Sequence, residues 1–245
     1  MKISSLLLIA ILGFTFEASG FTTRYWDCCK PSCSWPSAGG SHPAKHCDAS
    51  MNRLNDNDAK SMCEGGPSTA CLDQIPMVVS DNLAYAFAAA PGNGPNVCGK
   101  CFELSFTGQG KYETRLNHKK LAGKKLIVIS SNIGYDVAGG QFDLMIPGGG
   151  VGLYNGCNSI LGTNLGKQYG GLLADCEEEC GYSEPDESLY QKRKSCLTNK
   201  CNSAFSGKNQ ALQGCLFLAN WMEAAGCPTV EYREVDCPQQ LSSKY

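Results

Sequence analysis

Sixteen cysteines, all of them between Cys28 and Cys237, constrain the fold of this 245-residue chain more than any other feature. An even cysteine count in an exported protein is typical of a disulfide framework, in which bridges partly replace a large hydrophobic core. The cysteines recur without a gap long enough to separate modules, and no Pro/Ser/Thr-rich linker interrupts them. We therefore expect one disulfide-rich domain over residues 21–245.

The first twenty residues have the layout of a secretory signal peptide. Lys2 precedes an apolar run over residues 6–16, and a stretch of small residues follows over residues 18–20. We predict cleavage after Gly20, so that residues 1–20 are the signal peptide and the mature protein is secreted. The apolar run is shorter than the roughly 20 residues that a spanning helix needs, so we expect no membrane partner.

The charge balance and the histidine content narrow the possible partners. The formal net charge is -2, which argues against nucleic acid and anionic membranes and suits a neutral polymer. The chain has three histidines, His42, His46 and His118, and the Cys98 to Cys101 spacing has no second CxxC unit to accompany it. Zinc sites combine such units or add histidines, so we predict no metal and no cofactor.

Short runs of β-branched and aromatic residues predict strands that are far apart in the sequence. These runs cover residues 22–27, 101–107, 125–130, 142–146 and 230–235. Their spacing favours a barrel closed by long excursions over a chain of hairpins. Helices are predicted over residues 57–62, 81–88 and 210–225. The expected fold class is mainly β with short helices.

The segment over residues 22–35 places one carboxylate among aromatic rings and three cysteines. In an extended strand, Tyr25 and Asp27 share one face, while Trp26 points to the other face, toward a core. A plain strand that enters a disulfide-stapled turn is the simplest interpretation of an Asp near cysteines. A carboxylate with a ring beside it is also what a sugar-cutting cleft requires.

Cleavage of a glycosidic bond needs a second carboxyl group, because an acid must protonate the departing oxygen while a carboxylate on the opposite side activates water or attacks carbon. Asp143 and Asp136 are the two candidates. Asp143 lies between Phe142 and Leu144, and apolar neighbours can desolvate a carboxyl group, raise its pKa and keep it protonated. Asp136 lies in a glycine-rich loop, where we expect it to be more hydrated.

Three stretches of sequence resemble glycoside hydrolase family 45, the small secreted endoglucanases. They are T-R-Y-W-D-C-C-K-P-S-C over residues 23–33, F-D-L over residues 142–144 and P-G-G-G-V-G over residues 147–152. The resemblance spans nearly the whole chain after residue 20. It implies a six-stranded double-psi β-barrel and inverting endo-hydrolysis of a β-1,4-glucan by a monomeric enzyme without a cofactor.

The same resemblance assigns roles to individual residues. Asp27 corresponds to the catalytic base, Asp143 to the general acid, and Asp136 to an auxiliary carboxylate that lies over the bound sugar. We expect Tyr25 and Trp35 to bind substrate, Trp35 as a platform for a pyranose ring; the alternative is that Trp35 fills space under a disulfide loop. The family pattern also implies four disulfides: Cys28–Cys157, Cys29–Cys63, Cys33–Cys98 and Cys47–Cys71.

Several positions depart from the family or have a structural interpretation. Gln141 stands where many fungal members have His, and residues 111–120 and 176–201 match poorly, which predicts altered loops. Trp221 is expected in the core, and Arg24 in a structural ion pair. The glycine run over residues 147–152 is expected to let the backbone approach the sugar closely.

Three alternative functions remain open. The enzyme could prefer xyloglucan, or the chain could be a non-hydrolytic, expansin-like binder of cell-wall polysaccharide, a class that resembles the same barrel but lacks the first carboxylate. A disulfide-rich sugar-binding protein is the third possibility. Asp27 in its full sequence context favours the enzyme.

Overall fold

The computed structural model describes residues 18–91, 94–134 and 139–245. The strands are β1 (Ala18–Tyr25), β2 (Met77–Ser80), β3 (Leu83–Ala90), β4 (Cys101–Gly110), β5 (Lys125–Ile133), β6 (Gln141–Met145) and β7 (Pro228–Val235). The helices are α1 (Pro36–Gly39), α2 (Leu116–Lys119), α3 (Cys157–Leu161), α4 (Gly171–Cys180), α5 (Asp186–Ala204), α6 (Asn209–Asn220) and α7 (Gln239–Ser242). Short 3-10 turns are η1 (Ser32–Ser34), η2 (Met62–Glu64) and η3 (Gly94–Val97).

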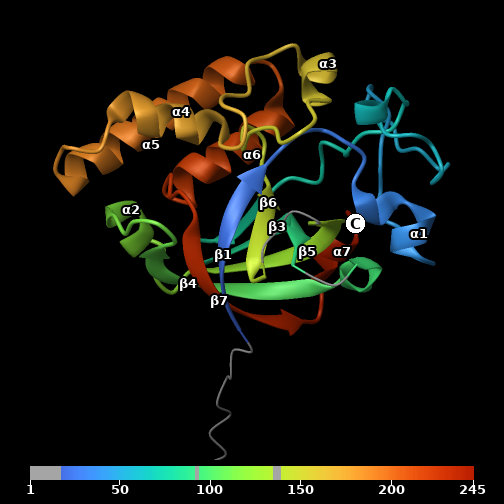
Figure 1. The fold of residues 1–245 in the computed structure, drawn as a ribbon, viewed down its shortest axis with the longest axis horizontal. Helices are drawn as coiled ribbons and strands as arrows, with labels where there is room; N and C mark the ends of the chain where they lie inside the picture. The colour runs from blue at the N-terminus through green and yellow to red at the C-terminus, as the bar shows by residue number, and fades with distance from the viewer. Residues whose placement is uncertain (1–17, 92–93, 135–138) are drawn as a thin grey trace, which may run out of the picture.

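Six strands form a closed ring in the order β3-β5-β4-β7-β1-β6. The ring closes because β6 pairs in parallel with β1 and also antiparallel with β3. β2 adds to the ring from outside by pairing with β3. Figure 1 shows the strands wound around one core, with α4, α5 and α6 gathered at one end. The six closed strands expected from the sequence are confirmed, and each of the five predicted strand runs overlaps a strand.

The interior of the ring is filled by apolar side chains that alternate with outward-facing residues. Phe87 of β3, Leu104 of β4, Leu126 of β5, and Phe142 and Leu144 of β6 are all buried. Full burial of one such side chain contributes about 1.5–3 kcal/mol relative to leaving it exposed. This packing fixes which face of each strand is turned away from the core, including the face of β6 that carries a carboxylate.

Two long helices, α4 and α5, were not predicted from the sequence. α4, α5 and α6 have 10, 19 and 12 residues, and two disulfides, Cys176–Cys196 and Cys201–Cys215, join α5 to the other two. The region over residues 176–201, expected to be an altered loop, is therefore mostly helical. The chain is mixed α/β rather than mainly β with short helices.

The helix predicted over residues 81–88 is wrong, because this segment forms the strand β3. Its residues from Ala84 to Ala90 are buried except for Tyr85. β3 pairs with β2, β5 and β6, so it lies inside the sheet with both faces covered. A short apolar run buried on both faces cannot be distinguished from a helix by its periodicity.

The helix predicted over residues 57–62 is also wrong. The ammonium group of Lys30 donates hydrogen bonds to the carbonyls of Asn57 and Ala59, at 2.6 and 2.9 Å. The carboxylate of Asp56 accepts from the backbone N–H of Asp58 and holds a turn. Backbone and side-chain groups that a helix would use are thus committed to other bonds. The helix predicted over residues 210–225 is confirmed as α6, which ends earlier, at Asn220.

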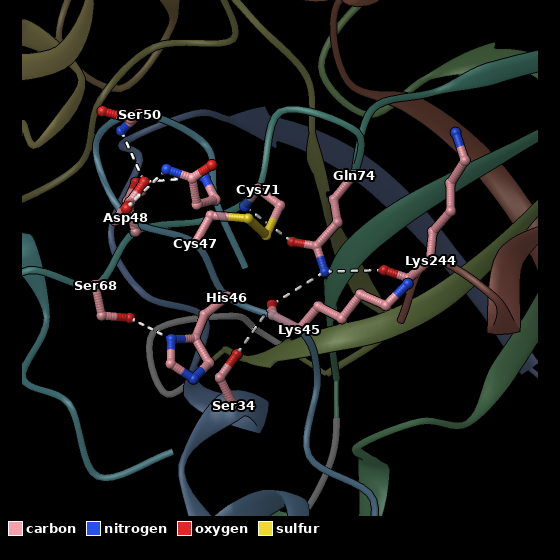
Figure 2. The surroundings of a disulfide bond; sticks show 12 residues. Ser34, Lys45, His46, Cys47, Asp48, Ser50, Ser68, Cys71, Gln74 and Lys244 are labelled. Carbon is pink, nitrogen blue, oxygen red and sulfur yellow. Dashed lines mark hydrogen bonds between the residues drawn. A yellow bond between two sulfur atoms is a disulfide. The ribbon is translucent and has the colours of Figure 1, made fainter. Parts of the chain in front are cut away.

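All four disulfides expected from the family pattern are present, namely Cys28–Cys157, Cys29–Cys63, Cys33–Cys98 and Cys47–Cys71. Figure 2 shows the surroundings of Cys47–Cys71, where side chains form hydrogen bonds near the disulfide. The amide of Gln74 donates to the carbonyls of Lys45 and Lys244, at 3.2 Å each, and the buried His46 is 2.7 Å from the hydroxyl of Ser68. Bridges and buried side-chain bonds therefore hold this part of the chain.

The strand β1 already begins at Ala18, and Ala18 to Gly20 pair with β7. Cleavage after Gly20 would remove these three pairs, and the position of the cut stays a prediction. Across the described ranges, no helix combines the length and the apolar character needed to cross a membrane.

Candidate active site

An open cavity of about 570 Å³ lies beside β1 and β6 and brings together three of the predicted site residues. Asp27, Asp143 and Tyr25 all line it. Asp136 lies outside the described residues. Trp35 is not among the residues that line this cavity.

Asp27 follows the end of β1, in a backbone turn that several bonds hold in place. Its carbonyl accepts from the N–H groups of Gly156 and Cys157, at 2.8 and 3.0 Å. Cys28, with a φ of 59°, takes the left-handed conformation and forms a disulfide with Cys157. A non-glycine residue in this region is uncommon and needs support from its surroundings. The disulfide and the two hydrogen bonds provide that support, so the backbone position from which the Asp27 carboxylate extends is fixed.

The environment of the Asp27 carboxyl group favours its neutral form. Burial raises its pKa above the ordinary value of 3.8, and the backbone N–H of Cys29, which donates to Oδ1 at 2.9 Å, opposes this rise only in part. Trp26, the next residue, packs edge-on against Phe205 in the core, as its alternation with Asp27 predicted. A carboxylate whose pKa is raised is a stronger base, because it binds a proton more readily.

Asp143 lies on β6 at the seam where the ring closes. It is paired with Thr23 of β1 on one side and Ala89 of β3 on the other. Its neighbours Phe142 and Leu144 are buried in the core, which leaves Asp143 on the cavity side of the strand. Ala89 also lines the cavity, and its small side chain leaves space beside the carboxyl group.

A chain of two hydrogen bonds leads to Asp143 from Gln141, which the sequence analysis named only as a departure from the family, through Thr23, which it did not select. The hydroxyl of Thr23 donates to Oδ1 of Asp143 at 2.6 Å, and the side-chain amide of Gln141 donates to that hydroxyl at 2.9 Å. Because the amide N–H can only donate, the Thr23 hydroxyl accepts from it and directs its own proton to Asp143. Thr23 could have been found from the two-residue period that it shares with Tyr25 and Asp27.

Tyr25 is positioned by Asn132, which the sequence analysis also did not select. The Asn132 amide donates to the Tyr25 hydroxyl at 3.2 Å. Its carbonyl oxygen accepts from the backbone N–H and the hydroxyl of Ser32, at 2.9 and 2.5 Å. Asn132 therefore connects the aromatic ring in the cavity to the turn that follows Asp27.

Trp35 lies beside Lys30, whose ammonium nitrogen is 3.4 Å from the centroid of the indole ring. This contact is a cation–π interaction and covers one face of the ring. The role of Trp35 as a sugar platform stays a prediction. Trp221 is in the core as predicted: it stacks on Phe217 and donates its indole N–H to the carbonyl of Ser80 at 3.0 Å.

Arg24 and the glycine run have different surroundings from those expected. Within the described residues, Arg24 has no ion pair, and its Nη2 donates to the carbonyl of Gly170 at 2.9 Å. Gly150, with a φ of 99°, accepts from the N–H of Trp26 at 2.7 Å, and a Cβ on it would lie 2.5 Å from the backbone nitrogen of Gly171. Its close approach is thus to other backbone, although Gly150 and Gly152 also line the cavity.

The cysteines whose spacing could suggest a metal site form disulfides instead. Cys98 is bonded to Cys33, and its CxxC partner Cys101 is bonded to Cys237. Cys180 and Cys227 are unpaired in the structure. The chemistry that the cavity offers is that of its two carboxyl groups: one held by hydrogen bonds on a strand, and one at a turn with a pKa raised by burial.

Comparisons with known proteins show which family the chain is similar to. The model of glycosyl hydrolase family 45 matches residues 19–209. Endoglucanase B of Cellvibrio japonicus is 45% identical over 234 residues, which are 92% of this chain but 45% of that protein. An endoglucanase of Cryptopygus antarcticus is 35% identical over 97% of this chain and 92% of its own length. The crystal structure of a cellulase from that springtail superimposes with a TM-score of 0.70 at 36% identity, and covers 92% of this chain and 94% of the springtail chain.

Proposed function

The chain belongs to glycosyl hydrolase family 45, and we propose that it is a secreted endo-β-1,4-glucanase that hydrolyses internal bonds of cellulose-type glucans with inversion. The observation that carries the proposal is that Asp27 and Asp143, from distant parts of the sequence, line one open cavity. The chain spans about half the length of the Cellvibrio relative, so any activity of further domains lies outside the proposal.

In the proposed mechanism, Asp143 gives its proton to the departing glycosidic oxygen. Asp27 takes a proton from a water molecule that attacks the anomeric carbon from the opposite face of the sugar. The Thr23 hydroxyl donates to Oδ1 of Asp143, so the transferable proton is assigned to Oδ2. The raised pKa of Asp27 supports its role as the base, because it brings the group closer to the pH at which a base works well.

The fold and the location of the protein are part of the same proposal. The parallel pairs β1/β6 and β3/β5, inside a ring that is otherwise antiparallel, support a six-stranded double-psi β-barrel. Seven disulfides support an oxidising, extracellular location, and with it a signal peptide over residues 1–20 before a catalytic domain over residues 21–245. The substrate is a neutral β-1,4-glucan, which suits the small net charge.

The proposal is tested by measuring new reducing ends on carboxymethyl cellulose, mixed-linkage β-glucan, xyloglucan and xylan, with product sizes recorded. We expect mixed oligosaccharides from the first two polymers. Faster cutting of xyloglucan would select the xyloglucan-preferring alternative. Preferential cutting of xylan, or release of single glucose units from chain ends, would contradict the proposal. Binding of glucan without any hydrolysis would favour the expansin-like alternative, against which Asp27 in the cavity argues.

A further inference from the structure

A second cavity, of about 360 Å³, adjoins the cavity that holds the two carboxyl groups. Thr23, Arg24 and Tyr169 line both of them. Because Thr23 also bonds to Asp143, the second cavity lies on the Asp143 side of the site. Its volume is within the range of about 300–1,000 Å³ that is usual for ligand pockets.

Exposed tyrosine rings surround this second cavity. Tyr112 is 82% exposed, Tyr169 is 67% exposed and Tyr182 is 55% exposed. Large aromatic rings that are left in solvent next to one another mark binding surfaces. A ring with a polar end combines an apolar face with a hydrogen-bonding group, which suits a sugar.

Charged side chains also line the second cavity. The Nε atom of Arg24 is buried and has no hydrogen-bond partner, while its guanidinium lies beside the thiol of Cys227. Glu177 lines the cavity as well, and so does Glu113, which forms an ion pair with Arg115. Charged groups of both signs beside tyrosine rings suit a ligand that is rich in hydroxyl groups.

Part of the wall of the second cavity comes from the two stretches that match the family poorly. Tyr112 belongs to residues 111–120, and Tyr182 to residues 176–201. Arg115 ties these stretches together, because it bonds to the carboxylate of Asp186 and to the carbonyl of Tyr182, at 3.3 Å each. The contacts of Arg115 therefore join the parts of the wall that these two stretches contribute.

We propose that the second cavity binds a further sugar unit of the same glucan chain that is cut between Asp27 and Asp143. The inference rests on the proposed function. Continuity of the two cavities at Thr23, Arg24 and Tyr169 gives the chain a path from one to the other. The enzyme then grips longer oligosaccharides more tightly than short ones, with Tyr112 as a specificity-determining residue.

The test compares Tyr112→Ala, Tyr112→Phe and the wild-type protein on the shortest cello-oligosaccharide that is cut and on cellohexaose. Tyr112 is largely exposed, so its truncation should leave the melting temperature unchanged. Loss of one aromatic contact should raise KM for cellohexaose about three- to tenfold in Tyr112→Ala, with little change for the short oligosaccharide. Tyr112→Phe keeps the ring and should retain most of the wild-type affinity. Equal effects on both lengths, or none, would overturn the inference.

A binding measurement separates this inference from the proposed function. Calorimetry of cellohexaose with Asp143→Asn and with Asp143→Asn/Tyr112→Ala measures affinity without hydrolysis. A three- to tenfold weaker affinity in the double variant supports the second cavity even if the wild-type protein cuts no glucan, which would refute the proposed function alone. Equal affinity of the two variants refutes the second cavity and leaves the proposed function standing.

Discussion

The hydroxyl of Thr23 donates a hydrogen bond of 2.6 Å to Oδ1 of Asp143, across the parallel pairing of β1 and β6. The same hydroxyl accepts from the amide of Gln141. The strand β1 thus carries both Tyr25, which lines the cavity, and Thr23, whose hydroxyl bonds to Asp143 on the neighbouring strand β6. Gln141, which stands where many fungal relatives have His, takes part in this arrangement through its hydrogen bond to Thr23.

We predict that Thr23→Val lowers kcat about fivefold, because the isosteric side chain cannot donate to Asp143 and loses one hydrogen bond of about 1 kcal/mol. Thr23→Ser keeps the hydroxyl and should retain most of the activity. Steady-state kinetics on β-glucan measure both variants. If Thr23→Val and Thr23→Ser are equally active, the hydroxyl has no part in orienting Asp143.

The two carboxyl groups should each be required. General acid or base catalysis is worth about 100- to 10,000-fold, so Asp27→Ala and Asp143→Asn should lose at least that much activity while they remain folded and bind glucan. Reducing-end assays and a glucan affinity gel measure the two properties separately. A variant that kept more than a tenth of the wild-type activity would have to be removed from the mechanism.

Asp27 should reduce the stability of the fold at neutral pH. Its pKa is raised in the folded protein by burial, so the folded state disfavours the ionised form, and stability is lost as the pH rises from the unfolded value of 3.8 through the folded value. Asn at this position keeps an oxygen for the Cys29 N–H and carries no charge. We expect Asp27→Asn to melt at a higher temperature than the wild-type protein near pH 7.

The same linkage gives the pH dependence of that difference. Below the unfolded pKa, Asp27 is protonated in both states, so the melting temperatures of the two proteins should converge. Thermal melts at several pH values between 3 and 8 provide the measurement. A variant less stable than the wild-type protein at pH 7 would show that the charge on Asp27 stabilises the fold instead.

The sequence was sufficient to predict a strand where one face of that strand packs against the core and the other does not. β6 shows this: the predicted strand is present, and Phe142 and Leu144 are buried on either side of Asp143. β3 lacks such alternation, because it is covered on both faces. α5 was missed for a different reason: its buried stripe, Leu189, Arg193, Leu197 and Cys201, has the spacing of a helix but contains an arginine. The Arg193 guanidinium is accommodated by the carbonyl of Gly181, at 3.0 Å.

Only the site residues that are close together in the sequence could be predicted from local sequence patterns. Asp27 and Tyr25 share a strand face, which the two-residue period indicates. Asn132 contacts Tyr25, and Gln141 contacts Thr23. Gln141 lies near Thr23 because β1 and β6 are paired, and Asn132 follows a register shift between β3 and β5. Pairing between strands so far apart in the sequence is set by tertiary packing, and no local pattern encodes it.

Removal of the Cys28–Cys157 disulfide should lower both stability and activity. The bridge ties the turn at Asp27 to the segment after Asp143, and a disulfide typically contributes about 2–4 kcal/mol. The double variant Cys28→Ser/Cys157→Ser is compared with Cys201→Ser/Cys215→Ser, which removes the bridge between α5 and α6. Both should melt earlier than the wild-type protein. At a temperature where both are folded, only the first should lose activity, and equal activities would show that the Cys28 bridge does not position Asp27.

The proposed mechanism makes a stereochemical prediction. Asp143 is paired with Thr23 of β1, and Asp27 lies four residues further along the chain, beyond the end of that strand at Tyr25. Inverting enzymes need carboxyl groups roughly 6.5–9.5 Å apart to admit a water molecule, whereas a retaining pair is about 5–5.5 Å apart. Proton NMR during the first minutes of hydrolysis should show the α-anomer of the product before mutarotation. Early appearance of the β-anomer would mean that one carboxylate attacks carbon directly, and the assignment of Asp27 as a base would be wrong.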